Sequence, residues 1–185
     1  MKKLLSIFVI ILLYSLNAKA THLVGGDFKV TMTNNGINSS LYEIQLRLYL
    51  DDVNGAVNMP NSVTIGIYQI GTNNLQTIKT LYLNGGSGSL VTLGDACFSP
   101  NPAIVRIEEG VYTGLNSVSL PNFSMGYYLH YETCCRNASV TNLSNPISDG
   151  ISILAIIPDP ALGQNSSPDF GDYPNDAYFC LNSTN

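Results

Sequence analysis

The cysteines are the residues of this chain whose chemistry is clearest. The sequence has 185 residues and contains Cys97, Cys134, Cys135 and Cys180. Four cysteines in an exported chain indicate disulfides. Neighbouring residues on a strand point to opposite faces, so Cys134–Cys135 is the least favoured bridge. We therefore expect Cys97 to pair with one member of that doublet and Cys180 with the other. A metal site is the alternative, although adjacent cysteines lack the usual spacing of zinc ligands.

Groups suited to hydrolysis are sparse. The histidines are His22 and His130, and the chain contains no Gly-x-Ser-x-Gly, His-Glu-x-x-His or phosphate-binding glycine loop. The carboxylate pairs Asp51-Asp52 and Glu108-Glu109 consist of adjacent residues, whose side chains diverge on a strand. A glycosidase needs two carboxyl groups that face one bond. We therefore expect no catalytic residues and no enzymatic function.

Two groups of oxygen ligands could bind calcium, the only cofactor that the sequence suggests. They are Asp51, Asp52 and Asn54 in one loop, and Asp169, Asp172 and Asp176 near the C-terminus. Hard oxygens on loops suit calcium, but neither group follows the twelve-residue loop that ends in glutamate. Because Asp and Asn also form turns without any metal, we favour turns at both places.

Tyrosines on the polar side of alternating segments are the candidate ligand-facing residues. Tyr49, Tyr68 and Tyr128 hold such positions. A tyrosine ring can stack on a sugar or pack against a protein partner, and it can also serve structure alone. The expected partner is thus an extracellular protein or a glycan.

Apolar residues recur with period two, which predicts strands to carry these groups. The clearest segments are 41–50, 63–67 and 127–134, and 151–157 is apolar throughout, as in a strand buried on both sides. Weaker segments are 23–33, 77–83, 89–93, 104–107 and 111–120. A turn is expected at Gly110, flanked by Glu108 and Glu109.

About nine short strands separated by turns predict an all-β fold. We expect an antiparallel sandwich of two sheets, stapled by disulfides, with a closed barrel as the alternative. One domain would span residues 21–185. After Pro158 the alternation ends, and residues 158–185 are expected to form an irregular tail packed across the domain.

The N-terminus has the pattern of a secretory signal peptide spanning residues 1–20. Lys2 and Lys3 precede an apolar run from Leu4 to Leu16, and the small residues Ala18 and Ala20 then mark a cleavage site before Thr21. The run is shorter than the roughly 20 residues of a membrane-spanning helix, although a retained anchor is the alternative. We expect a secreted or cell-surface protein without a transmembrane segment after cleavage.

The charge balance argues against a nucleic-acid partner. The formal net charge is −5, and loss of Lys2, Lys3 and Lys19 with the signal peptide lowers it to −8. No cluster of basic residues remains to bind phosphates.

Several stretches resemble a family of surface proteins. These are Thr21 to Asp27, Glu108 to Tyr112, Tyr131 to Ala138 with its Cys-Cys-Arg-Asn motif, Ile156 to Pro160, and Asn165 to Pro168. They are similar to the opening domain of large multidomain surface proteins of Bacteroidetes, which carry PKD-type or related β-domains and a gliding-motility-associated C-terminal sorting domain. The resemblance implies an adhesin-like or cell-envelope role, export completed by a type IX system, and no catalytic activity.

The chain departs from the pattern of that family in three respects. Asp52 and Arg106 stand where the family often has cysteines, so one bridge of the family could be missing here. The downstream repeats and the sorting domain are also missing, which suggests a short paralogue, a truncated reading frame or a fragment.

Overall fold

The computed structural model describes residues 23–53, 58–91, 106–137 and 140–168, and within them the protein is all-β. The strands are β1 (Leu23–Asn35), β2 (Ser39–Asp51), β3 (Ser62–Gln69), β4 (Leu75–Leu83), β5 (Ser89–Val91), β6 (Ile107–Thr113), β7 (Val118–Pro121), β8 (Tyr127–Thr133) and β9 (Ile151–Ile157). Three single turns of 3-10 helix, η1 (Asn84–Gly86), η2 (Pro146–Ser148) and η3 (Pro160–Leu162), interrupt the connections between strands or follow β9.

The nine strands form one continuous antiparallel sheet. Its order is β1-β2-β6-β4-β3-β8-β9, with β5 paired to β6 and β7 paired to β2. The expected all-β, antiparallel class is therefore confirmed. The division into two separate sheets is not observed among the described strands, which curl into a nearly closed, barrel-like arrangement.

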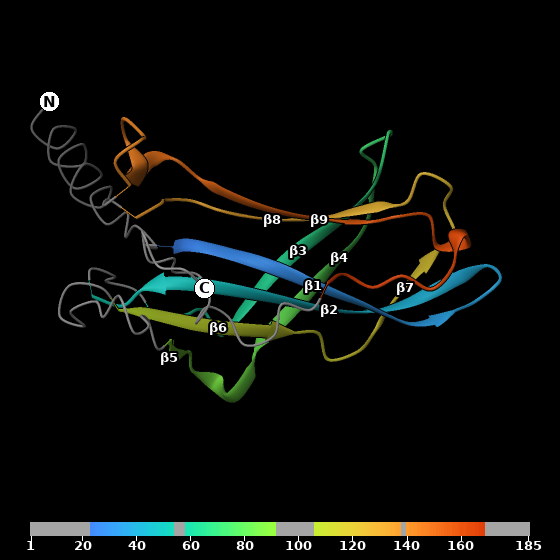
Figure 1. Ribbon diagram of the computed structural model, residues 1–185, viewed down its shortest axis with the longest axis horizontal. Helices are drawn as coiled ribbons and strands as arrows, with labels where there is room; N and C mark the ends of the chain where they lie inside the picture. The colour runs from blue at the N-terminus through green and yellow to red at the C-terminus, as the bar shows by residue number, and fades with distance from the viewer. Residues whose placement is uncertain (1–22, 54–57, 92–105, 138–139, 169–185) are drawn as a thin grey trace, which may run out of the picture.

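The sheet folds into two layers, β1-β2-β6 and β4-β3-β8-β9, which are joined at a narrow corner. Strands β4 and β6 share only the pairs Tyr82–Thr113 and Leu83–Tyr112. This short ladder connects β1-β2-β6 to β4-β3-β8-β9, and Figure 1 shows the β3–β4 hairpin running at a steep angle to β1, β2 and β6. A corner of two residue pairs leaves no mark on the hydrophobic pattern, so the sequence could not reveal it.

Alternation along the strands places the core between the layers. On β2, Tyr42, Ile44, Leu46, Leu48 and Leu50 are all buried, as the sequence pattern predicts. The facing layer adds a second set of side chains with almost no exposed surface: Ile65, Ile67, Leu81 and Leu129. Because both layers turn their apolar faces inward, their outer faces determine what the molecule presents to a partner.

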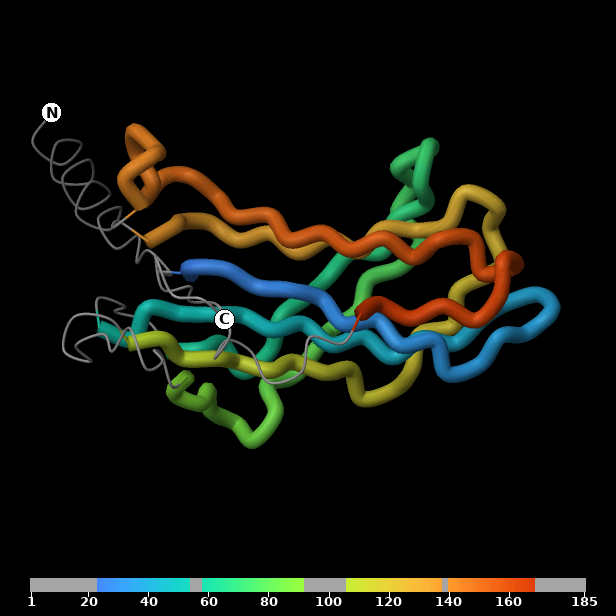
Figure 2. Tube along the Cα trace, in the orientation of Figure 1, coloured from blue at the N-terminus to red at the C-terminus, as the bar shows by residue number. Residues whose placement is uncertain are grey.

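The two ends of the sheet, β1 and β9, close against each other mainly through side chains. A Cβ atom on Gly26 of β1 would lie 2.5 Å from Cδ1 of Ile153 on β9, so only glycine allows this approach. Further along β1, the Val30 N–H donates to Ser167 Oγ (2.8 Å), and the Ser167 N–H donates to the Val30 carbonyl (2.8 Å). Figure 2 shows the segment that follows β9 turning back beside β1.

Three details of the strands differ from the prediction. Gly110 lies inside β6, paired with Leu48, and does not form a turn. Residues 111–120 divide between β6 and β7. Of the strand expected at 104–107, residues 104 and 105 lie outside the described residues, and Ile107 is the first residue of β6. Strand β9 is not buried on both sides, because Leu154 and Ile156 are 61% and 70% exposed.

The disulfide prediction is wrong for the cysteine doublet. Cys134 is bonded to Cys135, the pairing that strand alternation disfavours. The physical reason is that β8 ends at Thr133, so neither cysteine lies on a strand, and Cys135 adopts a left-handed backbone with φ of 82°. The expected partners Cys97 and Cys180 lie outside the described residues.

Candidate functional site

Two of the candidate tyrosines lie side by side on the outer face of the sheet. Tyr68 on β3 and Tyr128 on β8 are register partners, and their rings stack with centroids 5.1 Å apart and planes 14° apart. A Cβ atom at Gly66 would lie 2.4 Å from the Tyr68 ring, so the ring lies over this glycine. The Tyr128 hydroxyl donates to Asn73 Oδ1 at 3.3 Å. The two strands thus build an aromatic pair whose position is set by register.

Aliphatic side chains extend this pair across the neighbouring strands. The register places Ile156 beside Tyr128 and Leu154 beside His130 on β9, and Ile78 beside Gly66 on β4. Ile78 is 58% exposed, comparable to the two β9 residues. We name this surface the aromatic face, defined by Tyr68, Tyr128, His130, Ile78, Leu154 and Ile156. Exposed apolar residues that adjoin in this way mark interaction surfaces, whereas isolated ones do not.

Sequence reasoning missed the aliphatic part of the aromatic face. It treated 151–157 as buried on both sides because apolar residues run through it without interruption. The same run also fits a strand at the end of a sheet with an apolar outer face, and periodicity cannot separate the two cases.

His130 connects the aromatic face to polar groups on its border. Its Nε2 lies 2.6 Å from Ser152 Oγ and 3.8 Å from Glu132 Oε2. A Ser-His-acid site needs the serine and the acid on opposite ring nitrogens, but here both contacts involve the same nitrogen. The grouping therefore offers hydrogen bonds to a bound molecule and lacks the geometry of an activated serine.

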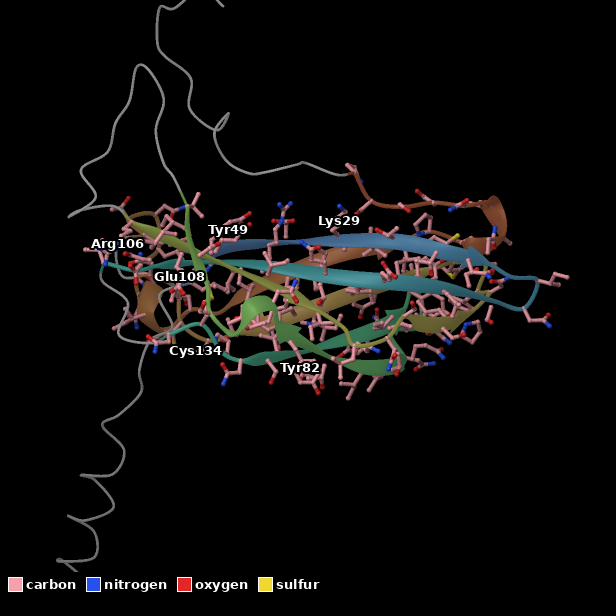
Figure 3. The ribbon with its side chains drawn as sticks, turned by 90° about the horizontal axis from the view of Figure 1, so that it is seen from below. Lys29, Tyr49, Tyr82, Arg106, Glu108 and Cys134 are labelled. Atoms are coloured by element: carbon pink, nitrogen blue, oxygen red, sulfur yellow. A yellow bond between two sulfur atoms is a disulfide. The ribbon has the colours of Figure 1, made fainter. Side chains whose placement is uncertain are left out.

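Tyr49 lies on the opposite outer face, away from the other two tyrosines. Figure 3 shows Tyr49 and Lys29 on one side of the molecule and Tyr82 of β4 on the other. The Tyr49 hydroxyl is 3.5 Å from Asp27 Oδ2 and 3.3 Å from Glu109 Oε1. Burial raises the pKa of Tyr49, and the two carboxylates add to this effect although the Arg47 charge opposes it. The Tyr49 hydroxyl therefore belongs to a network across three strands.

Arg47 holds the other end of that network. Its Nη2 lies 3.0 Å from Asp27 Oδ1, and its side chain is only 9% exposed. Burial lowers the pKa of Arg47, but the hydrogen bond and the charge of Asp27 outweigh this and leave the pKa raised. The guanidinium thus remains charged and ties β2 to β1.

Asp51 and Asp52, two of the calcium candidates, accept hydrogen bonds from protein groups. Buried Asp51 accepts from the Asn137 amide (2.6 Å) and from the Val53 N–H (3.0 Å). Asp52 forms an ion pair with Arg106. Asn54, Asp169, Asp172 and Asp176 lie outside the described residues. Within the described part of the chain, no three His, Cys, Asp or Glu residues gather in a way that could hold a metal ion.

The signal-cleavage residues Ala18, Ala20 and Thr21 also lie outside the described residues. Among residues that the structure describes, no helix is long and apolar enough to cross a membrane. Comparisons with protein-family models, with curated proteins and with solved structures found no match to this chain.

Proposed function

We propose that this protein is a secreted or cell-surface interaction module without catalytic activity, adhesin-like, that binds its partner through the aromatic face. The observation that carries the proposal is the exposure of Ile78, Leu154 and Ile156 around the stacked Tyr68–Tyr128 pair. Aromatic residues in the middle of an apolar patch are the usual centres of binding energy in protein interfaces.

The electrostatics of the face support a protein partner. Glu132, at its border, has a side chain that is 76% exposed, and the six residues that define the face include no Lys, Arg, Asp or Glu. Depletion of charge at the centre with polar groups at the rim is typical of protein interfaces. The signal-peptide pattern expected for residues 1–20 and the resemblance to adhesin-like surface domains favour a partner outside the cell.

The test compares exported wild-type protein with the double variant Leu154→Lys/Ile156→Lys. Both positions are exposed, so the variant should fold, while two charges beside the stacked tyrosines oppose burial of the patch in an interface. Leu115→Lys is the matched control, since Leu115 is 75% exposed in the turn after β6 and lies outside the face.

Binding of labelled protein to washed cells of the source organism is then measured against concentration. We expect saturable binding of wild type and of Leu115→Lys, and at least about tenfold weaker binding of the double variant. Absence of saturable binding by wild type, or equal binding by all three proteins, would contradict the proposal.

A glycan-binding domain is the second candidate, favoured by hydrogen-bonding groups beside the aromatic pair. His130 and Ser152 adjoin Tyr128 through the β8–β9 register, and sugars combine ring stacking with such polar contacts. A glycan ligand should raise the melting temperature of wild type and have no effect on Tyr68→Ala. The calcium-dependent form of this candidate gains no support from Asp51 and Asp52, which bind Asn137 and Arg106.

A further inference from the structure

Strands β3 and β8 separate over half their length. Their ladder has four residue pairs, from Gly66–His130 to Gln69–Tyr127. Strand β3 nevertheless begins at Ser62, and β8 continues to Thr133. Over these outer halves β3 stays paired to β4, and β8 stays paired to β9. Beyond the Gly66–His130 pair the two strands are therefore no longer paired with each other, and we name this gap the β3–β8 seam.

A cavity of about 440 Å³ lies at this open seam. Val63 of β3 and Tyr131 of β8 line it, together with Leu23, Leu48 and Leu50 from the opposite layer. All five side chains belong to the buried core of the protein. The volume falls within the range of small-molecule sites in proteins, roughly 300–1,000 Å³.

Met59 also lines the cavity. Its sulfur lies where a Cβ atom on Gly110 would approach to 2.9 Å, so glycine at this point of β6 makes room for it. The Tyr112 hydroxyl contacts the same sulfur at 3.6 Å. A thioether side chain adapts its shape to an apolar ligand more readily than a branched one does.

The rim of the cavity is polar and carries no cation. Its polar side chains are those of Asn58, Ser62, Thr64, Glu132 and Thr133. Amide and hydroxyl groups bind other hydroxyl groups, whereas the Glu132 carboxylate repels anions. The rim therefore favours a neutral, hydroxyl-bearing head group over a carboxylate or a phosphate.

We propose that the β3–β8 seam is a binding site for a small amphiphile with one aliphatic chain and a neutral, hydroxylated head group. The chain lies against Leu48, Leu50 and Val63, and the head group contacts the hydroxyls of Ser62 and Thr64. The site does not depend on the aromatic face, because neither Tyr68 nor Ile156 lines the cavity.

The test uses protein labelled with ¹³C at the methionine methyl groups and decyl glucoside below its micelle concentration as the probe. Met59 lines the cavity, whereas Met32 lies on β1 and Met125 before β8, so two signals serve as internal controls. We expect saturable shifts of the Met59 signal only, and at least about tenfold weaker binding of decanoate, which has the same chain length and an anionic head.

Two variants separate this site from general adsorption of amphiphiles. Thr64→Phe places a ring at the rim from an exposed strand position, and Ser119→Phe places the same ring at an exposed position of β7 outside the cavity. Thr64→Phe should weaken binding at least about tenfold, while Ser119→Phe should bind as wild type does. Unshifted Met59, equal shifts at all methionines, or Thr64→Phe binding as tightly as wild type would each overturn the proposal.

Discussion

Two buried tyrosines each donate a hydroxyl hydrogen bond to a backbone carbonyl outside their own strand. The Tyr112 hydroxyl donates to the Pro60 carbonyl at 2.9 Å, and the Tyr127 hydroxyl donates to the Pro121 carbonyl at 2.8 Å. Burial raises the pKa of both phenols above the ordinary value of 10.0. Burial thus favours the neutral form of both groups in the native state.

Raised tyrosine pKa values predict that the protein loses stability in alkali. Below pH 10 the phenols are neutral in both states, but above it they ionise in the unfolded chain first, which favours unfolding. Tyr112→Phe should cost about 1 kcal/mol at pH 8 because a hydrogen bond is lost. Its free energy of unfolding should then fall less than that of wild type between pH 8 and pH 11.

Urea unfolding at the two pH values measures this difference. Tyr82→Phe is the control, because Tyr82 is 43% exposed on the outer face of β4 and should leave the difference unchanged. A Tyr112→Phe protein whose stability falls as steeply as that of wild type would show that this phenol is not the titrating group.

Asp52, which directly follows β2, pairs with Arg106, which directly precedes β6. The Asp52 N–H donates to the Arg106 carbonyl at 2.9 Å, and the two side chains form an ion pair. Because both side chains are more than a third exposed, the pair contributes only about 0–1 kcal/mol. These are the two positions at which the resembled family often has cysteines.

This contact predicts that the double variant Asp52→Cys/Arg106→Cys forms a disulfide. The two positions already lie side by side, so the bridge should form without rearrangement and add roughly 2–4 kcal/mol to the free energy of unfolding. Mass spectrometry of proteolytic fragments identifies the bond. Each single cysteine variant should retain an alkylatable thiol, and a double variant that also retains thiols would refute the prediction.

Residues 164–167 cover the outer edge of β1, which would otherwise be the free edge of the sheet at this point. Besides the Val30–Ser167 bonds, the Met32 N–H donates to Ser166 Oγ at 3.1 Å, and the Gln164 side-chain amide donates to the Met32 carbonyl at 3.3 Å. Covering an edge strand removes a template for aggregation.

Loss of the two serine hydroxyls should therefore expose this edge. In Ser166→Ala/Ser167→Ala we expect faster amide hydrogen exchange at Val30 and Met32 and a stability loss of about 1–3 kcal/mol. Exchange at Ile44 and Leu46, on the neighbouring strand, is the internal reference. Unchanged protection at Val30 and Met32 would mean that these hydroxyls do not hold the segment in place.

The molecule as a whole presents two unlike outer faces. The β1-β2-β6 side carries the polar network of Asp27, Arg47, Tyr49 and Glu109, and the β4-β3-β8-β9 side carries the aromatic face. Figure 3 shows the two sides through Tyr49 and Tyr82. Among the described residues, the stacked aromatic pair and the exposed aliphatic side chains around it thus share one side of the protein.

The N-terminus and the pairing of the cysteines can both be tested on the intact protein. We expect the secreted protein to begin at Thr21, and its fragment with Cys134 and Cys135 to be free of alkylation and lighter by a pair of hydrogens than the reduced form. Intact mass and peptide mapping under alkylation test both points. A fragment in which Cys134 or Cys135 is cross-linked to Cys97 or Cys180 would restore the pairing expected from strand alternation.

The sequence by itself determined the all-β class and most strand positions. The alternation on β2 identified all five of its core residues from Tyr42 to Leu50, because a half-buried strand must turn every second side chain inward. It also placed Tyr68 and Tyr128 on polar strand positions, where the structure finds the centre of the aromatic face.

Only the tertiary structure decided how the strands meet, since strand order, corners and seams depend on contacts between residues far apart in the chain. The two-pair corner between β4 and β6 joined the layers, and the outer face of β9 was left uncovered, which exposes Leu154 and Ile156. Because β8 ends at Thr133, Cys134 and Cys135 do not lie on a strand and their side chains need not point to opposite faces. Local patterns report which face of a strand is buried, and they carry no information about which strand lies beside it.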